Sequence, residues 1–287
     1  MKERLAALLG SEVVSLEQVR GRGYTAAGRY RVTLGDGRRV FAKLGVEELT
    51  SGWLREEHLV YSHVSGPFIP PLLGWDDDGA APMLVLPDYG DAFDAPPWTD
   101  ERIAAVHESL RLLRDTAPPP DLPRVERFDE MRGRWDRIAA DPAAFLSVGV
   151  CSREWLDANV EALQAAAHSA PLAGEALLHF DVRSDNIAFV EGRAILVDWN
   201  WSSRGNPDVD VAAWLPSLHA EGGPEPDALY DGPPEVIAFI AGVWASGVGL
   251  PPPPTADPSM RATQLAQLRT ALPWACRALG LPPPDGG

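Results

Sequence analysis

The chain has 287 residues, of which 45% are hydrophobic, and its formal net charge is −16. This length allows one large or two modest domains, each with a buried core. The acidic excess argues against nucleic acid or an anionic membrane surface as the main partner, because their phosphates would be repelled. It fits a cationic partner, and it fits equally well a surface that only keeps the protein in solution.

The chain lacks the usual signs of export or membrane insertion. Its longest apolar run, Val236 to Leu250, contains glycines and a serine and is shorter than the ~20 residues that span a bilayer. Met1 is followed by charged residues instead of a signal-peptide core. Cys151 and Cys276 lie far apart, without a metal or redox spacing. We therefore expect a cytoplasmic protein with reduced thiols.

The first part of the chain is predicted to be a short helix followed by an antiparallel sheet. Residues 1–10 form an amphipathic pattern that ends at Gly10, and strands are predicted at 13–19, 30–34 and 39–44. The connection between the first two strands is rich in glycine. Gly21 and Gly23 would let backbone N–H groups approach phosphate oxygens, although glycine-rich turns also join hairpins that bind nothing.

A buried ion pair is predicted between the third strand and the next helix. The helix is expected at 52–64, with Ser51 as its cap. Glu57 lies on its apolar stripe, and a carboxylate placed there is costly unless it is paired. Lys43, on the third strand, is the expected partner, although a strand lysine can also extend to water. Glu56 is the reserve choice for this pair.

The remaining elements divide the chain into two parts. A hairpin is predicted from 72–75 and 83–86, and a proline-rich break over 87–97 follows it. We place a boundary near residue 88, with one domain over 1–88 and another over 89–287. The second part is predicted to be mostly helical, with helices at 100–116, 128–140, 152–168, 208–220, 233–247 and 259–279.

The most informative stretch is His179-Phe-Asp-Val-Arg-Ser-Asp-Asn186. Two short apolar runs follow it around the turn Glu191-Gly192-Arg193, and the second run leads to Asp198. These runs predict a hairpin that brings Asn186 and Asp198 to the same end. Two oxygen ligands with Asp181 just upstream are what a phosphoryl-transfer site needs, with Mg²⁺ on the pair and the hydroxyl proton on Asp181. Because a nucleotide is itself an anion, its site in so acidic a protein needs a metal or local basic residues.

The order of these parts resembles the protein-kinase-like fold, specifically the aminoglycoside phosphotransferase family of small-molecule kinases. The resemblance covers roughly residues 13–280. It rests on the stretch from His179 to Asn186, on Val197-Asp198-Trp199, and on the segment Gly205-Asn-Pro-Asp-Val-Asp210. It implies an α+β fold of two lobes: a small N-terminal lobe built on an antiparallel sheet and a larger, mostly helical C-terminal lobe. One departure is Phe180, because the family usually has a small residue after the histidine.

The resemblance also implies roles for individual residues. Asp181 would be the catalytic carboxylate, and Asn186 and Asp198 would bind Mg²⁺. Lys43 would contact the α- and β-phosphates of ATP or GTP, and Glu57 would orient it. The remaining implied residues are Thr25 at a phosphate, Leu86 and Tyr89 at the base, His179 and Asp210 as supports of the catalytic loop, and Arg183 either at the γ-phosphate or paired with Asp185.

The implied reaction is transfer of the γ-phosphoryl group to a hydroxyl of a cationic small molecule. An aminoglycoside or a tuberactinomycin-type basic cyclic peptide is expected, which would connect the protein to antibiotic resistance. The alternatives are a metabolic kinase for choline or an amino sugar, and a catalytically inactive nucleotide-binding regulator. The candidate acceptor residues are Trp199, Trp201, Asp208, Glu221, Asp227 and Asp231, followed by Asp91, Asp94, Trp214 and Glu225.

Overall fold

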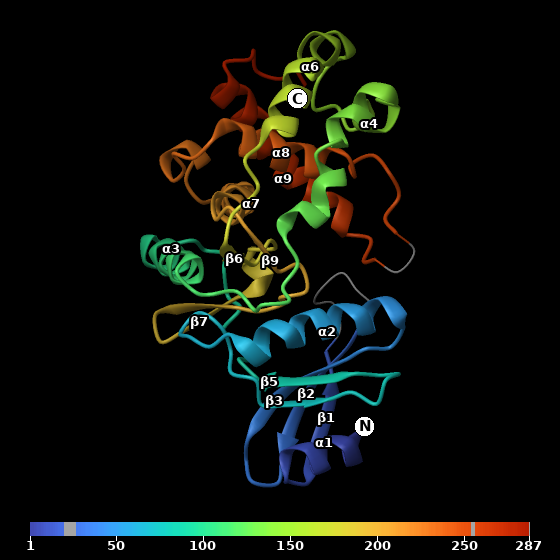
Figure 1. Ribbon diagram of the computed structural model, residues 1–287, viewed down its shortest axis with the longest axis vertical. Coiled ribbons are helices and arrows are strands. Elements are labelled where there is room, and N and C mark those ends of the chain that lie inside the picture. Colours follow the sequence, from blue (N-terminus) through green and yellow to red (C-terminus); the bar gives the residue numbers. More distant parts are fainter. Residues whose placement is uncertain (20–26, 254–255, 287) are drawn as a thin grey trace.

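The computed structural model describes residues 1–19, 27–253 and 256–286. Its first part is an antiparallel sheet with the strand order β1-β2-β3-β5-β4 (Figure 1). The strands are β1 (Val13–Gln18), β2 (Gly28–Leu34), β3 (Arg39–Leu44), β4 (Gly74–Asp76) and β5 (Met83–Pro87). The predicted meander and the following hairpin are therefore confirmed.

Two helices cover opposite faces of this sheet (Figure 1). Leu5 and Leu9 of α1 (Lys2–Leu9) pack with Val32 and Val40 in a small core on one face. The helix α2 (Glu48–His63) lies on the other face, where its apolar stripe joins the large core of the helical part. Because side chains alternate along a strand, the residues between the core positions of β2 and β3 point toward α2 and the second part.

The helix α2 begins earlier than predicted. Glu47 is its N-cap, and a capping box links the Glu47 and Thr50 side chains to each other's backbone N–H groups. Ser51, predicted as the cap, is buried inside the first turns, so that prediction is wrong. The physical reason is that the reciprocal box satisfies two orphan N–H donors, whereas a single serine cap satisfies one.

The second part is mostly helical (Figure 1). Its α-helices are α3 (Asp100–Arg114), α4 (Arg134–Ala140), α5 (Ala143–Leu146), α6 (Arg153–Ser169), α7 (Asp208–Ala220), α8 (Pro234–Ala245) and α9 (Met260–Leu279), and its 3₁₀ turns are η1 (Val125–Met131), η2 (Ser184–Asn186) and η3 (Pro226–Ala228). The helix predicted at 128–140 is divided instead into η1 and α4, with Gly133 as the N-cap of α4. None of the described helices is long and apolar enough to cross a membrane.

Two small sheets hold the central stretch in place. The strands β7 (Ile187–Val190) and β8 (Arg193–Leu196) form the predicted hairpin. The strands β6 (Ala176–Leu178) and β9 (Ser203–Gly205) pair with each other, and β9 was not predicted because a three-residue strand leaves almost no periodic signal. The segment from His179 to Asn186 therefore connects β6 of one sheet to β7 of the other. Asp198 lies in the segment that connects β8 to β9.

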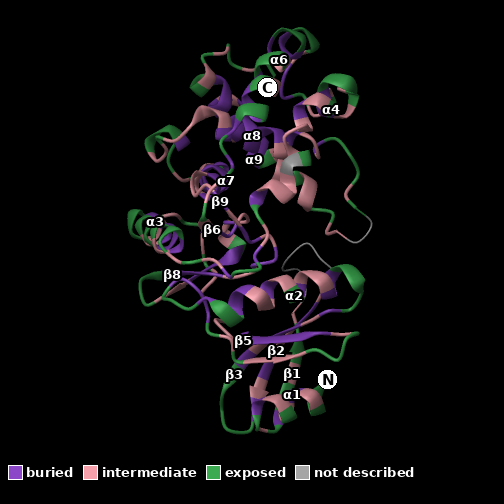
Figure 2. Ribbon diagram, viewed as in Figure 1, coloured by how far each residue is buried: buried purple, intermediate pink, exposed green. Residues whose placement is uncertain are grey.

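The large core joins α2 to the helical part. It contains the fully buried rings of Trp135, Trp199, Trp214 and Trp274, and Figure 2 shows the buried segments of α7 and α8 near its centre. The predicted boundary near residue 88 follows the end of β5, and as a division into domains it stays a prediction.

Candidate active site

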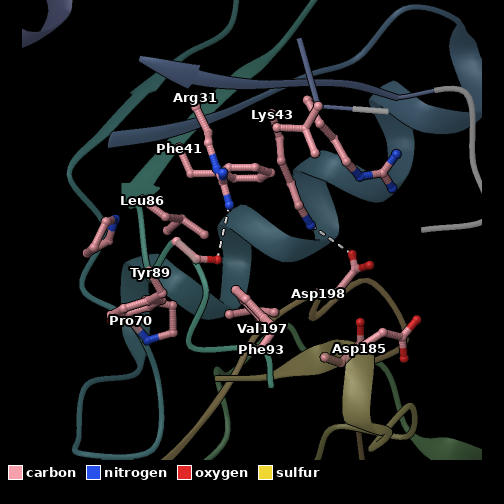
Figure 3. Close-up of a pocket in the computed structure, with 15 residues that line it drawn as sticks. Arg31, Phe41, Lys43, Pro70, Leu86, Tyr89, Phe93, Asp185, Val197 and Asp198 are labelled. Atoms are coloured by element: carbon pink, nitrogen blue, oxygen red, sulfur yellow. Dashed lines mark hydrogen bonds and ion pairs between the residues drawn. The ribbon is translucent and has the colours of Figure 1, made fainter. Parts of the chain in front are cut away.

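A pocket lies between the sheet and the helical part (Figure 3). It encloses about 690 Å³ of space, including the part open to solvent. Lys43, Asp185, Asn186 and Asp198 lie at one end, and Leu86, Pro87, Tyr89 and Gly90 line the other. Lys43, Leu86, Tyr89, Asn186 and Asp198 are therefore brought to one cavity as expected, whereas Asp181 is not among its lining residues.

Lys43 is the centre of a buried ion-pair cluster. Its Nζ donates to both oxygens of Glu57, each at 2.8 Å, and to Oδ1 of Asp198 at 2.8 Å. The pair with Glu57 was expected, whereas the direct contact with Asp198 was not. Glu56, the reserve choice, instead pairs with Arg127 at 3.2 Å. Because α2 carries Glu57 and the segment after β8 carries Asp198, Lys43 links three separate elements.

The charges in this cluster shift one another's pKa values. Burial would raise the pKa of Asp198, but the cations of Lys43 and Arg29 outweigh it and hold that pKa well below its usual range. Burial would lower the pKa of Lys43, but Asp198 and Glu57 outweigh that effect and raise it. Burial raises the pKa of Glu57 to about 7 despite the nearby Lys43. Asp198 is therefore ionised and Lys43 protonated at neutral pH.

Asp181 is held by its own loop. Arg183 donates to its carboxylate from Nε at 2.9 Å, and Asn186 Nδ2 donates to its Oδ2 at 2.9 Å. Arg183 also pairs with Asp185 at 3.2 Å, which is one of its two expected roles. The additional pairing with Asp181 was not anticipated. These contacts set the orientation of the Asp181 carboxylate beside the pocket.

His179 and Asp210 support this loop from behind. Asp210 accepts the N–H groups of His179 at 2.8 Å and Phe180 at 2.6 Å, and burial raises its pKa to about 7. His179 Nδ1 accepts the Asp181 N–H at 3.2 Å, so its Nε2 carries the hydrogen that is donated to the Val197 carbonyl at 2.9 Å. The positions of both side chains fit the expected bracing roles.

Phe180 and Asp198 both have left-handed backbone conformations, with φ of 62° and 71°. Such values are uncommon for residues other than glycine and cost of order 1–3 kcal/mol each. The two hydrogen bonds to Asp210 hold the strained turn at Phe180. The strain falls on the two segments that carry Asp181 and the expected metal ligand.

The residues expected to bind Mg²⁺ suit such an ion. The Val197 N–H donates to the Asn186 carbonyl at 2.9 Å, so the backbone keeps Asn186 and Asp198 together. Asn186 uses Nδ2 toward Asp181, which assigns metal binding to its Oδ1. The described residues contain no group of three or more His, Cys, Asp and Glu that could hold a metal. Mg²⁺ needs no such group, because one or two protein oxygens with phosphates and water complete its shell.

Leu86 and Tyr89 lie at the other end of the pocket, as expected for the base. The Tyr89 carbonyl accepts the Ala92 N–H at 3.0 Å, whereas the Tyr89 N–H makes no hydrogen bond within the described parts of the chain. Pro87 lacks an N–H. Tyr89 is therefore the residue of this segment that can offer a backbone donor to a base. Gly21, Gly23 and Thr25 lie outside the described residues.

Several acceptor predictions need correction. The Trp199 ring is fully buried, and its Nε1 donates to the Leu196 carbonyl at 2.9 Å. Trp214 is also fully buried. Both rings are therefore core residues, and the prediction that they contact an acceptor is wrong. For Trp214, the apolar neighbours Ala213 and Leu215 were a signal of burial, whereas Trp199 stands between Asp198 and Asn200 and gave no such signal.

The predicted acidic residues are also used in other ways. Both oxygens of Glu221 are engaged, one by the Ser184 hydroxyl at 2.6 Å and the other by Trp98 Nε1 at 2.9 Å. Glu221 therefore fastens η2 to the end of α7 and is not open to an acceptor. Asp227 and Glu225 share one cation, Arg277 of α9, so their predicted contact with an acceptor stays a prediction. Trp201, Asp208 and Asp231 are partly or fully exposed, and their predicted role stays a prediction.

Two arginines of β2 were missed. Arg29 and Arg31 line the pocket together with Phe41. In the ladder between β2 and β3, Arg29 lies opposite Lys43, and Arg31 lies opposite Phe41. Arg31 donates to the Gly90 carbonyl at 3.1 Å, as Figure 3 shows. A signal for Arg31 was present in the sequence, because it alternates with Tyr30 and Val32 along the strand predicted at 30–34, whereas Arg29 lies just before that predicted strand.

Comparisons with known proteins support the fold. No family model and no curated protein matches this chain in sequence. A protein described as a fructosamine-3-kinase from Thermobifida fusca is 20% identical, with a TM-score of 0.59 and coverage of 97% of this chain and 99% of that one. A choline/ethanolamine kinase family protein from Mesorhizobium loti is 18% identical, with a TM-score of 0.57 and coverage of 98% and 94%. An amicoumacin kinase in complex with AMP-PNP, Ca²⁺ and Ami is 13% identical, with a TM-score of 0.51 and coverage of 98% and 93%.

These likenesses extend over nearly the whole length of both chains. The small sheet lobe and the larger helical lobe are their common architecture. The predicted α+β, two-lobed architecture is thereby confirmed, and the chain has the fold of the protein-kinase-like small-molecule kinases.

Proposed function

We propose that the protein is an O-phosphotransferase that moves the γ-phosphoryl group of ATP or GTP to a hydroxyl of a cationic small molecule. The observation that carries this proposal is the cluster of charged side chains around Lys43 at one end of the pocket. Lys43, Glu57 and Asp198 are joined there by contacts of 2.8 Å, and Asn186 lies beside them. A catalytically inactive regulator has no need to retain this set together with Asp181.

The reaction follows from the positions of these groups. The acceptor oxygen forms a bond to the γ-phosphorus while the bond from that phosphorus to the bridging oxygen of the nucleotide breaks. Asp181 orients the hydroxyl and accepts its proton late in the transfer, since an ionised carboxylate is a weak base for an alcohol. Lys43 neutralises charge on the α- and β-phosphates, and Glu57 orients Lys43. Mg²⁺, held by Asn186 Oδ1 and Asp198, would neutralise the charge that develops on the phosphates.

The proposed acceptor is defined first by its positive charge. The chain carries a net charge of −16, and Asp185 adds a carboxylate to the pocket wall. Both features attract cations. We propose an antibiotic acceptor, either an aminoglycoside or a tuberactinomycin-type peptide, and the likeness in fold to an amicoumacin kinase supports an antibiotic.

The test is a coupled ADP-release screen of the purified protein with ATP and Mg²⁺, repeated with GTP. The acceptors are aminoglycosides, basic cyclic peptides, choline, an amino sugar and neutral sugars, and the Asp181→Asn variant serves as the blank for each. We expect turnover on a cationic antibiotic above that blank. Turnover on choline or the amino sugar alone would identify a metabolic kinase, and turnover on neutral alcohols alone would refute the cationic acceptor.

A further inference from the structure

The phosphate end of the pocket has too little positive charge if Lys43 acts alone. The Lys43 ammonium donates hydrogen bonds to two carboxyl groups, those of Glu57 and Asp198. Asp185 adds a third carboxyl group to the pocket, and Arg183, which pairs with it, also pairs with Asp181. A nucleotide polyphosphate would enter a region that is neutral or negative, inside a protein that already has a net charge of −16. Mg²⁺ at Asn186 and Asp198 would offset part of this negative charge, and a second protein cation beside Lys43 would offset more.

Arg29 supplies that cation. It lies directly opposite Lys43 on the neighbouring strand, it lines the pocket, and only 8% of the residue is exposed. Burying a guanidinium is costly unless other groups compensate its charge. Its Nη1 donates to the Ala27 carbonyl at 3.3 Å.

The other arginine of β2 has a different task. Arg31 lies two residues further along the same face, where its guanidinium donates to Gly90 and faces Asp88 at 3.5 Å. The Asp88 side chain is only 3% exposed, so the charge of Arg31 is compensated at the base end of the pocket. Arg29 and Arg31 are thus similar residues on one strand face, and only Arg29 lies beside Lys43.

We infer that Arg29 is a phosphate-binding residue that acts with Lys43 on the polyphosphate of the nucleotide. This inference rests on the proposed function, because it assumes that a nucleotide occupies the pocket. Arginine suits the role, since its fixed array of donors matches phosphate oxygens and its charge does not depend on pH. Arg29 lies on the regular strand β2, so its guanidinium is held in place before the nucleotide binds.

The test compares ligands that differ only in phosphates. Dissociation constants for adenosine, AMP and ADP are measured by calorimetry for the unchanged protein and for Arg29→Gln, Arg29→Lys and Arg39→Gln, with Mg²⁺ and again with EDTA. Guanosine, GMP and GDP replace them if GDP binds more tightly than ADP. Arg39 is the matched control, because it lies on the adjacent strand, outside the pocket, and pairs with Asp88. Thermal unfolding without ligand checks that each variant is folded.

We expect Arg29→Gln to weaken ADP binding about 10- to 100-fold, the usual loss for a hydrogen bond to a charged group, and to leave adenosine binding unchanged. Arg29→Lys should retain part of the ADP affinity, Arg39→Gln should change nothing, and the loss should persist in EDTA. Equal losses for adenosine and ADP, or no loss for either, would overturn the inference. If the unchanged protein binds neither ADP nor GDP, the proposed function itself fails, and that result is distinct from a failure at Arg29 alone.

Discussion

At the scale of single residues, hydrogen bonds from its own loop hold Asp181 in position. Arg183 and Asn186 donate to its carboxylate, and the backbone at its own N–H is fixed by His179. The Asp181→Asn variant retains the shape of this loop but cannot accept a proton. We expect turnover to fall about 10²- to 10⁴-fold, with ADP affinity unchanged by calorimetry. Full turnover by this variant would contradict the proposed mechanism.

Trp199 and Trp201 are close in sequence but differ in burial. Trp199 is fully buried, so Trp199→Ala should leave a cavity and lower the free energy of unfolding by about 3–5 kcal/mol. Trp201 is partly exposed and contacts the Phe128 ring, with the ring centres 5.5 Å apart, so Trp201→Ala should cost clearly less. Urea denaturation of the two variants measures the difference. Equal losses would show that Trp201 also belongs to the core.

Asp210 predicts a pH dependence of stability. Burial raises its pKa to about 7, well above the usual pKa of an aspartate. The folded state therefore binds this proton more tightly than the unfolded state does. The resulting contribution to the free energy of unfolding is fully present below about pH 4 and is lost as the pH rises through 7. Glu57, with a pKa of about 7, contributes in the same direction. Asp210→Asn should flatten the fall between pH 4 and 7 in urea denaturation, and an unchanged slope would contradict this assignment.

At the scale of elements, α2 is fastened on both sides by consecutive glutamates. Glu57 binds Lys43, and Glu56 pairs with Arg127, which also donates to the Ser202 carbonyl at 3.0 Å. Arg127 therefore connects α2 to the segment that follows Asp198. The link is partly exposed, so its direct contribution to stability should be below about 1 kcal/mol.

Arg127→Gln should lower kcat/KM for the nucleotide several-fold, because α2 and the segment after Asp198 lose a common anchor. Steady-state kinetics with varied ATP measures this effect. Arg55→Gln is the control, since Arg55 also lies on α2 but pairs with Asp77 in the sheet lobe, and its kinetics should not change. Equal effects of both substitutions would indicate general loosening of α2.

At the scale of the whole molecule, the pocket is built from both parts of the chain. A nucleotide with Mg²⁺ should therefore stabilise them together and raise the melting temperature. The rise should shrink in EDTA and in the Asp198→Ala variant, because the metal site is lost. A differential scanning measurement with AMP-PNP records both. A rise that does not depend on Mg²⁺ would remove Asn186 and Asp198 from the metal site.

Local features were the ones that could be predicted. The hairpin from Ile187 to Leu196, the helix that carries Glu57, and the pair between Glu57 and Lys43 each follow from a period, a turn or the cost of an unpaired buried charge. The start of α2 was misjudged, because a serine in the right place looks like a cap until the Glu47 and Thr50 box is seen. The short strand β9 was missed, because its partner β6 is distant in sequence.

Residue patterns alone predicted the strands of the first part, the helices of the second part, the pair of Lys43 with Glu57, and the hairpin that brings Asn186 and Asp198 together. The two-lobed fold was implied by the resemblance to the aminoglycoside phosphotransferase family. Only the tertiary structure decided which acidic and aromatic residues remain available to a ligand. Glu221 accepts a hydrogen bond from Ser184 of the catalytic loop, Trp199 is buried in the core, and Arg29 lies opposite Lys43 on the neighbouring strand. The physical reason is that burial and pairing depend on what packs against a side chain, and that neighbour is usually far away along the chain.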